Sequence, residues 1–444
     1  MNKKIMEILE SQNPWWFNEN FDIGINRLNF FNNIIKYINL QEILFLIGVR
    51  RTGKSTLMYQ LINYLLNKNV KSKEILFINF DEPFLKSNVN NSQLLIEIIE
   101  NYLILNKDIN KLYVFLDEIQ VYPYWSESLK YLYDVKKNIK IIASGSSSNL
   151  IESKLAIKLS GRYFYENIYP LSFGEYLNFN NLNKIKSIEY KYYFDKYLLE
   201  GGFPRVVLEK DDKIKIELLK NYFQTIYLKD IIIPNNLRNN QEVYNLLYYL
   251  LSNVSKLYSY NSLVKVLNIS VDTIKEYISF ANKSYFIFNL SMYSDSVKKQ
   301  LVNPKKIYSV DTGLANSISF RFSEDKGRLL ENLVFIELKR REKEVYYHRG
   351  KKECDFVIKE GLDIVQAIQV TKSLESEELG DEIKKREIDG LLDACKTYNL
   401  NEGLILTQDE EGEETREVKL KNGEKKEVKI IVKPIWKWLL ELKG

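Results

Sequence analysis

The sequence predicts an α/β fold built on a parallel sheet that is buried on both faces. Three segments support this prediction: EILFLIG at 42–48, KLYVFLDEIQ at 111–120 and IKIIASGSSSNLI at 139–151. Each holds a short, nearly continuous apolar run, which is typical of strands covered by helices on both sides. The first run is followed by a glycine-containing loop and then, at 54–66, by apolar residues with helical spacing. A strand, a loop and a helix therefore follow one another.

The loop between this strand and this helix is a candidate phosphate-binding loop. Residues 48–55 read GVRRTGKS and fit the pattern G-x-x-x-x-G-K-[ST]. Such a loop wraps closely enough for its backbone N–H groups to point at phosphate oxygens, and the helix N-terminus adds its dipole. Lys54 is expected to reach the β- and γ-phosphates of ATP, and Ser55 to bind Mg²⁺. The residues expected at the nucleotide are Gly48, Arg51, Thr52, Gly53, Lys54, Ser55 and Thr56.

The second strand supplies the acidic groups that a P-loop ATPase needs. Its apolar run ends in Asp117 and Glu118. Asp117 is expected to hold Mg²⁺, usually through water, and Glu118 to polarise the attacking water. In isolation the same residues fit a buried strand that ends in a solvated acidic turn, but the phosphate-binding loop favours the catalytic interpretation.

Two further features fit an ATPase site. The third strand ends in small polar residues, and either Ser144 or Ser146 is a candidate sensor of the γ-phosphate, with an ordinary turn as the alternative. Arg162 follows Gly161 and is a candidate to stabilise charge on the transferred phosphoryl group, from the same chain or from a neighbour. The alternative for Arg162 is an ordinary surface arginine.

The length and composition of the chain predict the number of domains and exclude several other classes of function. The chain has 444 residues, which predicts roughly three domains, and no apolar run approaches the roughly 18 residues of a spanning helix. We expect a cytoplasmic protein without a membrane partner, since the start lacks the apolar stretch of a secretory signal.

The net charge of +5 is small against 64 basic and 59 acidic residues, so it indicates no strong preference for nucleic acid. The single histidine, His348, argues against a histidine zinc site or a Ser-His-Asp hydrolase. Cys354 and Cys395 are expected to be packing residues.

Several motifs together resemble a family of archaeal and bacterial AAA+-type ATPases that is similar to the origin-recognition and STAND-like ATPases. The motifs are QNPWW at 12–16, the two arginines of the loop, FLDEIQ, SGSSS, GRY with PLSFGEY, and GGFP at 201–204. The resemblance implies an ATPase core over 1–170 and a helical lid over 171–240. Arg50 and Arg51 are then typical of the family, and we expect them to face the lid, a neighbouring subunit or solvent.

Residues 241–310 are expected to form a winged helix. Two short helices across a tight turn, with Ser270 as an N-cap, precede the strand-like stretch YFIFNLSMYS and the basic segment VKKQLVNPKK at 297–306. Such modules contact DNA or dock proteins, and both alternatives stay open here. Lys265, Lys275 and Lys283 are compatible with either.

The last part of the chain, 311–444, carries a second candidate site. A helix bears Glu331, a following strand bears Asp355, and the next strand bears polar residues. This order resembles the restriction-endonuclease-like domain that follows the ATPase in the same family, in which Asp and then Glu-x-Lys bind Mg²⁺ and position water. Here Gln369 stands in place of Glu and Thr371 in place of Lys. A degenerate domain that binds DNA or protein is therefore favoured over an active nuclease. A hairpin is expected around Asn422 and Gly423.

The sequence thus predicts an Mg²⁺-dependent ATPase whose nucleotide cycle regulates a C-terminal module that binds DNA or protein. Two alternatives remain: a nucleotide switch with little turnover, and an ATP-regulated nuclease. The sequence does not fix the oligomeric state, and an oligomer is compatible with it.

Overall fold

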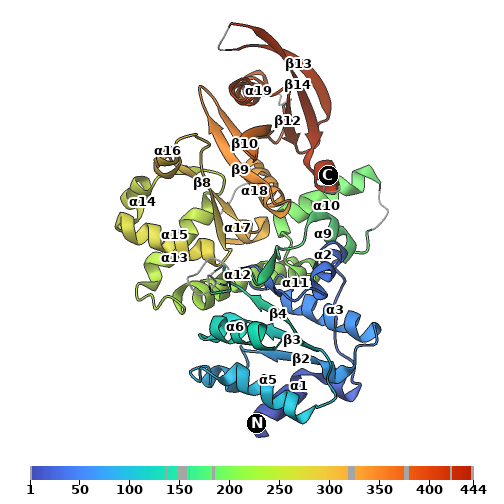
Figure 1. Ribbon diagram of the computed structural model, residues 1–444. Helices are drawn as coiled ribbons and strands as arrows, with labels where there is room; N and C mark the ends of the chain where they lie inside the picture. The colour runs from blue at the N-terminus through green and yellow to red at the C-terminus, as the bar shows by residue number, and fades with distance from the viewer. Residues whose placement is uncertain are drawn as a thin grey trace. The chain divides into compact units, whose positions relative to one another are not determined.

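The computed structural model describes residues 3–136, 138–148, 150, 158–159, 161–182, 186–318, 326–374, 380–420 and 423–441 (Figure 1). The chain divides into two compact units. Unit 1 comprises residues 1–168 with 283–285, and unit 2 comprises 169–282 with 286–444. Within the described residues, no helix combines the length and the apolar character that crossing a membrane requires.

Unit 1 is built on a parallel sheet with the strand order β2-β3-β4-β1-β5. Its strands are β1 (Ile43–Ile47), β2 (Ile75–Asn79), β3 (Leu112–Asp117), β4 (Ile139–Gly145) and β5 (Tyr163–Asn167). Every residue of β1, β3 and β4 is buried, which confirms the prediction of strands covered on both faces.

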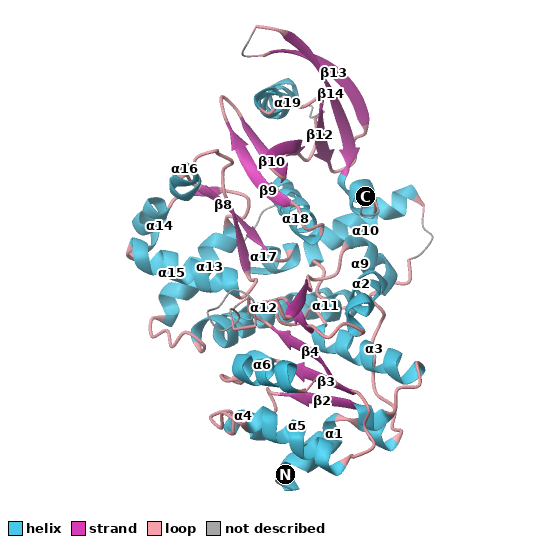
Figure 2. Ribbon diagram, viewed as in Figure 1, coloured by secondary structure: helices cyan, strands magenta, loops and turns pink. Residues whose placement is uncertain are grey.

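Helices cover this sheet and fill the connections between its strands (Figures 1 and 2). They are α1 (Lys3–Gln12), α2 (Leu28–Ile38), α3 (Lys54–Asn67), α4 (Pro83–Ser87), α5 (Leu94–Leu105) and α6 (Trp125–Val135), with the short turns η1 (Pro14–Phe17), η2 (Ser72–Glu74) and η3 (Ile119–Val121). Their buried faces carry leucine, isoleucine and aromatic side chains, so the core of unit 1 lies on both sides of the sheet.

The QNPWW segment closes the β2 edge of the sheet with side chains. Asn13 accepts a hydrogen bond from the backbone N–H of Phe77 (2.7 Å) and donates one to the carbonyl of the same residue (2.9 Å). The indole N–H groups of Trp15 and Trp16 both donate to the carbonyl of Ile75, at 3.2 and 2.9 Å. Gln12 accepts from the N–H of Asn79 at 2.9 Å. Backbone groups that an edge strand would leave unpaired are therefore satisfied.

Unit 2 begins with a helical region whose glycines permit close contacts. The helices are α9 (Phe173–Phe179), α10 (Ser187–Glu200), α11 (Pro204–Leu208), α12 (Asp212–Ile226) and the π-helical turn η4 (Tyr227–Ile232). The carboxylate of Asp311 accepts a hydrogen bond from the N–H of Gly202 (2.7 Å), and a Cβ at Gly201 would lie 2.0 Å from the same carboxylate. The GGFP motif therefore serves packing against Asp311, whose pKa is raised to about 6 by burial.

A small three-stranded sheet with three helices follows. The antiparallel order is β6-β8-β7, with β6 (Leu257–Tyr258), β7 (Ile287–Leu290) and β8 (Lys305–Ser309). The helices are α13 (Asn240–Ser252), α14 (Tyr260–Leu267) and α15 (Val271–Lys283), and the short α16 (Val297–Val302) lies between β7 and β8. Ser270 accepts a hydrogen bond from the N–H of Thr273 (3.2 Å), which confirms it as the N-cap of α15.

The C-terminal part of unit 2 holds a mixed sheet with the order β13-β14-β12-β11-β10-β9. Its strands are β9 (Glu344–Arg349), β10 (Glu353–Glu360), β11 (Asp363–Val370), β12 (Glu402–Thr407), β13 (Gly412–Lys419) and β14 (Lys425–Pro434). The helices are α17 (Thr312–Ile318), α18 (Lys326–Arg340), α19 (Gly380–Thr397) and α20 (Ile435–Leu440). The predicted hairpin forms as β13 and β14, although Asn422 itself lies outside the described residues.

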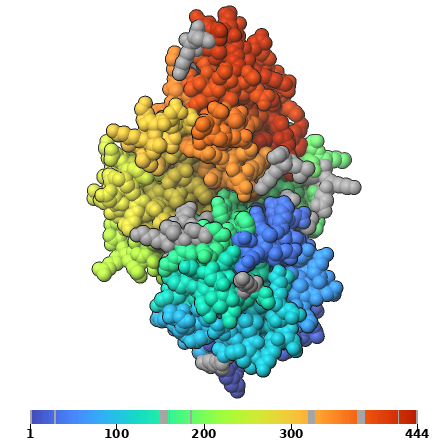
Figure 3. Space-filling model, in the orientation of Figure 1, coloured from blue at the N-terminus to red at the C-terminus, as the bar shows by residue number. Residues whose placement is uncertain are grey.

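Helix α19 packs on this sheet through an apolar core. Cys354 of β10 and Cys395 of α19 are both free thiols, buried in this core together with Leu391 and Val428. The loop after β7 also joins the sheet, because the N–H of Tyr293 donates to the carbonyl of Tyr347 at 2.9 Å. Figure 3 shows the adjoining yellow and orange surfaces of these two segments.

A first prediction tests the closed edge. We expect Asn13→Ala to lower the free energy of unfolding by about 3 kcal/mol, because the N–H and carbonyl of Phe77 would stay buried without partners. Urea denaturation measures this change. Asn88→Ala, at an exposed asparagine, is the matched control and should cost about 0.5 kcal/mol or less. If Asn13→Ala lowered the free energy of unfolding as little as the control does, the backbone groups of Phe77 would have other hydrogen-bond partners.

A second prediction concerns the single histidine. Burial lowers the pKa of His348, and its Nε2 contact with Asp393 (3.2 Å) only partly opposes this effect. The folded pKa lies below the unfolded value of 6.5. Between these two pH values the folded protein therefore binds fewer protons than the unfolded chain. The contribution of neutral His348 to the free energy of unfolding should therefore be fully present above pH 6.5 and be lost as the pH drops through the folded pKa.

Histidine-selective NMR measures this pKa directly, since the chain gives one imidazole signal. Denaturation of wild type and His348→Gln at two pH values gives the stability effect, which should be smaller in the variant. A midpoint above 6.5 would mean that the Asp393 contact outweighs burial.

Candidate functional site

The loop between β1 and α3 has the geometry of a phosphate-binding loop. A Cβ at Gly48 would lie 2.2 Å from the carbonyl oxygen of Ile168, so only glycine fits there. Lys54 is the first residue of α3 and is only 4% exposed. Its ammonium donates to the carbonyls of Gly48 (2.8 Å) and Val49 (3.0 Å). The lysine is thus held inside the curve of the loop that it follows.

Two contacts fix the shape of this loop. The hydroxyl of Thr52 donates to the carbonyl of Val49 at 3.0 Å. The buried guanidinium of Arg27 donates to the carbonyl of Thr52 at 2.9 Å and lies 4.6 Å from the centre of the Phe30 ring. Sequence reasoning missed Arg27, because an arginine ahead of a helix carries no local signal that it will reach a loop 25 positions away.

Asp117 lies at the end of β3 and is held by two serines. Its Oδ2 accepts from the hydroxyl of Ser55 at 2.7 Å, and its Oδ1 accepts from the hydroxyl of Ser144. Burial raises the pKa of Asp117, as does the neighbouring charge of Glu118, whereas the two hydroxyls and Lys54 lower it. The parallel order β3-β4-β1 brings these groups together at the carboxyl ends of three adjacent strands.

Glu118 lies beside this cluster in a left-handed backbone conformation, with φ 52° and ψ 43°. A non-glycine residue in this region costs about 1 kcal/mol, and such residues are often found at active sites. Its carboxylate accepts a hydrogen bond from the amide of Gln120 and lies 3.5 Å from the guanidinium of Arg50. Arg50 therefore contacts Glu118 and is mostly shielded from solvent, while the expectation that it faces the lid or a neighbouring subunit stays a prediction.

These residues fit a nucleotide with Mg²⁺. The Gly48 position leaves no room for a side chain, the ammonium of Lys54 points into the loop, and the hydroxyl of Ser55 and the carboxylate of Asp117 are hard oxygen donors in contact. Lys54 and the loop would hold the phosphates, while Ser55 and Asp117 would hold the metal ion.

The other predicted residues of this site lie as follows. Gly53 is the left-handed N-cap of α3, with φ 92°, and Thr56 lies in the first turn of that helix. Arg51 is exposed and has φ 71°. Ser146 is buried and accepts from the amide of Gln120 at 3.1 Å, so the direct contact with Asp117 belongs to Ser144.

The structure does not bring Arg162 to this site. Its carbonyl pairs with the N–H of Ile43 at the start of β1, whereas the phosphate-binding loop follows the end of β1. The five residues of β1 separate the two points, roughly 17 Å. Its guanidinium instead binds Asp134 at 3.0 Å. A role within the same chain is therefore contradicted, and a role across a subunit interface stays a prediction.

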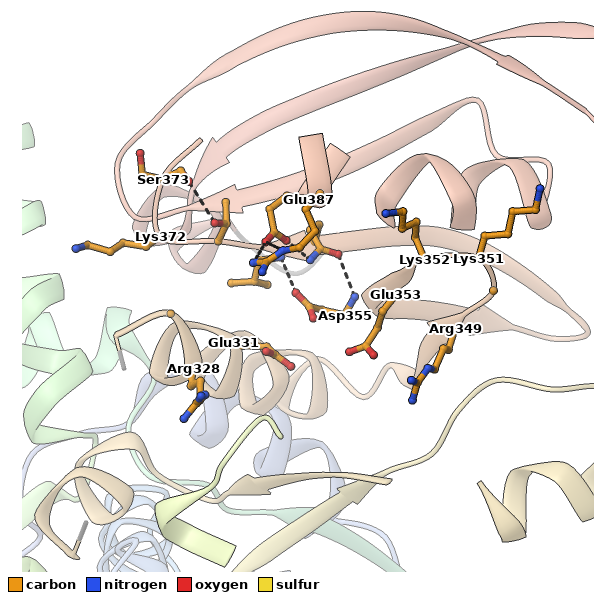
Figure 4. Close-up of a pocket in the computed structure, with 16 residues that line it drawn as sticks. Arg328, Glu331, Arg349, Lys351, Lys352, Glu353, Asp355, Lys372, Ser373 and Glu387 are labelled. Carbon is orange, nitrogen blue, oxygen red and sulfur yellow. Dashed lines mark hydrogen bonds and ion pairs between the residues drawn. The ribbon is translucent and has the colours of Figure 1, made fainter. Parts of the chain in front are cut away.

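The second candidate site is a pocket of about 1020 Å³ in unit 2. Glu331, Asp355, Gln369 and Thr371 all line it, so the structure brings these four predicted residues together (Figure 4). A register shift between Cys354 and Val357 of β10 marks a bulge at Asp355, a feature that re-aims side chains near sites. Lys372 also lines the pocket, just beyond the end of β11 at Val370.

A buried lysine, which is not among the residues that line this pocket, joins three of the carboxylates that do. Lys306 is 3% exposed, and its ammonium lies 2.8 Å from Asp355, 3.0 Å from Glu331 and 3.0 Å from Glu353. It belongs to the basic segment 297–306 of the expected winged helix, and its burial among these carboxylates was not predicted. Burial raises the pKa of Glu331 to about 8, and the charge of Asp355 adds to this effect.

Both polar atoms of the Gln369 side chain are also hydrogen-bonded within the protein. Its carbonyl oxygen accepts from the N–H of Asp355 (3.2 Å), and its amide donates to Glu387 of α19. Glu387 in turn binds Arg386. Within the part of the chain that the structure describes, no group of three or more acidic, histidine or cysteine side chains is arranged to hold a metal ion. The residues of this pocket therefore do not fit the Mg²⁺ site of an active nuclease.

Comparisons with known proteins agree with the site in unit 1. Residues 40–177 match the family described as AAA domain, and residues 191–325 match a domain of unknown function (DUF8612). The first match covers the phosphate-binding loop, Asp117 and Glu118.

Among solved structures, the Walker-type ATPase PABY2304 of Pyrococcus abyssi is similar with a TM-score of 0.44 at 16% identity, covering 66% of this chain and 95% of that chain. The Aeropyrum pernix ORC1 protein, solved in complex with DNA, gives a TM-score of 0.34 at 11% identity, covering 67% and 93%. Both scores lie below 0.5, and we draw no conclusion from them.

Two relatives extend over most of the chain. The uncharacterized protein MJ1544 of Methanocaldococcus jannaschii is 34% identical over 412 residues, which cover 88% of this chain and 87% of the relative. An uncharacterized protein of Haemophilus influenzae is 31% identical over 349 residues, covering 77% and 85%. The chain therefore belongs to the same protein family as MJ1544 of Methanocaldococcus jannaschii, and its residues 40–177 form a AAA domain of the P-loop ATPase class.

Proposed function

We propose that this protein is an Mg²⁺-dependent ATPase whose nucleotide cycle regulates binding by its C-terminal module. One observation carries the proposal. The metal-binding pair Ser55 and Asp117 is in contact with the candidate sensor Ser144, directly beside Glu118 and the phosphate-binding loop. These side chains come from four separate segments, and a purely structural cluster would not need a phosphate-binding loop beside it.

The proposed reaction is attack of water on the γ-phosphate. Lys54 and the backbone N–H groups of the loop bind and orient the phosphates. Glu118 orients the water and accepts its proton, once its carboxylate turns from Arg50 and Gln120 toward the nucleotide. Mg²⁺, when bound, offsets charge on the phosphates. Ser144 connects the proposed metal ligand to the proposed base. Its hydroxyl contacts Asp117 and accepts a hydrogen bond from the N–H of Glu118 at 3.1 Å.

We also propose domain assignments for the rest of the chain. The order α13, β6, α14, α15, β7, β8 over 241–310 supports a winged helix. The order α18, β9, β10, β11, α19, β12 within 311–444 supports a restriction-endonuclease-like fold. Residues 171–240 would be the lid, and hydrolysis would be coupled to these parts by movement of that lid.

The partner of the C-terminal module would be DNA or a protein. A nucleotide switch with slow turnover is the second candidate function. It is favoured by the ion pair between Arg50 and Glu118, which holds the proposed base away from water. An ATP-regulated nuclease is disfavoured by the contacts of Lys306.

A third prediction tests the phosphate-binding loop. We expect Lys54→Ala to lower ATP hydrolysis by about 100-fold or more, because it removes the cation that contacts the phosphates. Lys68→Ala, at the exposed end of the same helix, is the matched control and should keep wild-type activity. Hydrolysis that survives in Lys54→Ala would exclude this loop as the active site.

The same assay separates the candidate functions when it is run with and without single-stranded, double-stranded and branched DNA. Steady turnover that rises with DNA supports the ATPase proposal, and a single burst with retained ADP supports the switch. DNA cleavage with Mg²⁺ that disappears in Asp355→Ala would support the nuclease.

A fourth prediction tests the role of Glu118. Glu118→Gln should bind ATP as wild type does but hydrolyse it about 100-fold more slowly or worse, because the amide cannot accept the proton of the water. Gel filtration after incubation with labelled ATP should recover ATP, not ADP, with the variant. Glu127→Gln, at a partly exposed carboxylate that binds Lys158, is the control for loss of one negative charge. Recovery of ADP from Glu118→Gln would mean that another group activates the water.

A further inference from the structure

We propose that the pocket of the C-terminal module binds the phosphodiester backbone of a nucleic acid without a metal ion, and that the ammonium of Lys306 takes the place of a divalent cation. The inference rests on the proposed function, and it names both the partner and the chemistry of recognition. It begins from the disagreement between the carboxylates of the pocket and the metal site that their fold would imply.

Both oxygens of Asp355 and one oxygen of Glu331 are already used by contacts within the protein. Asp355 accepts from Lys306 through Oδ1 (2.8 Å) and from the N–H of Val370 through Oδ2 (3.0 Å). Glu331 accepts through one oxygen from both Lys306 (3.0 Å) and the hydroxyl of Tyr308 (2.7 Å). A divalent cation would have to displace a buried ammonium and leave it without a partner, which is energetically very unfavourable.

Lys306 also changes the net charge at the floor of the pocket, which is formed by Glu331, Glu353 and Asp355. Glu331, Glu353 and Asp355 together would repel a phosphate, and in a metal-dependent nuclease the metal ion removes that repulsion. Here a single internal cation lies within 3.0 Å of all three carboxylates. The floor is therefore partly neutralised by the chain itself, at any concentration of magnesium.

The walls of the pocket are basic. The cations that line it are Arg328, Arg349, Lys351, Lys352, Lys372 and Arg386. Figure 4 shows Lys372 on one side of the carboxylates and Arg349, Lys351 and Lys352 on the other. Within the described residues, no ion pair joins the side chains of Arg349, Lys351, Lys352 or Lys372 to a carboxylate.

This distribution favours a polymer with repeated negative charges. Arg349 ends β9 and Lys351 and Lys352 lie in the turn before β10, whereas Lys372 lies on the other side of the carboxylates, just after β11. Guanidinium groups and ammonium groups on both walls suit a chain of phosphates that passes between them. A phosphodiester and a carboxylate each carry one negative charge, but the phosphates of a nucleic acid repeat at a short, regular spacing along the whole chain. We therefore commit to nucleic acid and let the experiment test an acidic protein segment.

The first part of the experiment measures binding of fluorescent single-stranded DNA, double-stranded DNA and single-stranded RNA to the full chain without nucleotide. Wild type should bind at least one of them with the same affinity in EDTA and in Mg²⁺, within a factor of two. Lys351→Glu with Lys352→Glu should weaken this binding about 10-fold or more and make its salt dependence shallower. Lys3→Glu with Lys4→Glu, on exposed α1, makes the same charge change and should have less than a twofold effect.

The second part tests the lysine at the centre. Lys306→Met should weaken binding in EDTA about 10-fold, and Mg²⁺ or Mn²⁺ should restore it, because the three carboxylates would then accept a metal ion. Electron paramagnetic resonance should detect Mn²⁺ bound to this variant but not to nucleotide-free wild type. Because Lys306→Met leaves buried carboxylates unpaired, Lys306→Met with Glu331→Gln is a second variant. It restores the charge balance and should bind in EDTA within about threefold of wild type.

Three results would overturn the inference. They are loss of wild-type binding in EDTA, Mn²⁺ binding to nucleotide-free wild type that Asp355→Asn removes, and competition by polyglutamate as effective as that by nucleic acid. The proposed function is tested separately by ATP turnover. Turnover without pocket-dependent nucleic-acid binding overturns this inference alone, and pocket-dependent binding without turnover overturns the ATPase proposal alone.

Discussion

The carboxylate of Asp117 is buried at the end of a central strand, and both of its oxygens are held by serine hydroxyls from neighbouring segments. A buried charge is stable only when it is paired or hydrogen-bonded, and this constraint fixes the relative positions of β3, β4 and the start of α3. Lys54 obeys the same constraint through two carbonyls of its own loop. The ATPase site is thus held together by a few polar contacts within an otherwise apolar sheet.

The same constraint operates in unit 2 through Lys306. This residue lies on β8, whereas its partners lie on α18 and β10, so one ammonium joins the small three-stranded sheet to the C-terminal sheet. The predicted boundary at residue 310 separates Lys306 from all three of its partners. The structure places both sides of that boundary in one compact unit, and a domain cut there would leave charged groups unpaired on each side.

The sequence allowed the ATPase core to be predicted because its signals are local. Strands β1, β3 and β4 follow from short apolar runs, and Lys54, Ser55 and Asp117 follow from a motif with fixed spacing. Most of the contacts that were missed join residues far apart in the chain. Lys306 lies in a basic stretch of the sequence and Glu387 in a charged one, and charge alone does not reveal a distant partner.

Arg50 shows the same difficulty within the phosphate-binding loop. It lies in a recognisable motif, but its contact with Glu118 depends on the left-handed conformation of that glutamate, which no periodic pattern predicts. Gln120 was likewise missed, although it follows Glu118 by only two positions and contacts it directly. In both cases the residues were visible in the sequence, and only the direction of their side chains was not.

The side-chain closure of the β2 edge affects how copies of this protein can associate. An open edge strand invites another chain to add a strand, which leads to sheet extension or aggregation. Here Asn13, Trp15 and Trp16 occupy the backbone groups that such an intruding strand would require. Self-association of unit 1 therefore cannot extend its sheet from β2, and any assembly that uses this unit must be built from helix and loop surfaces or from the opposite edge at β5.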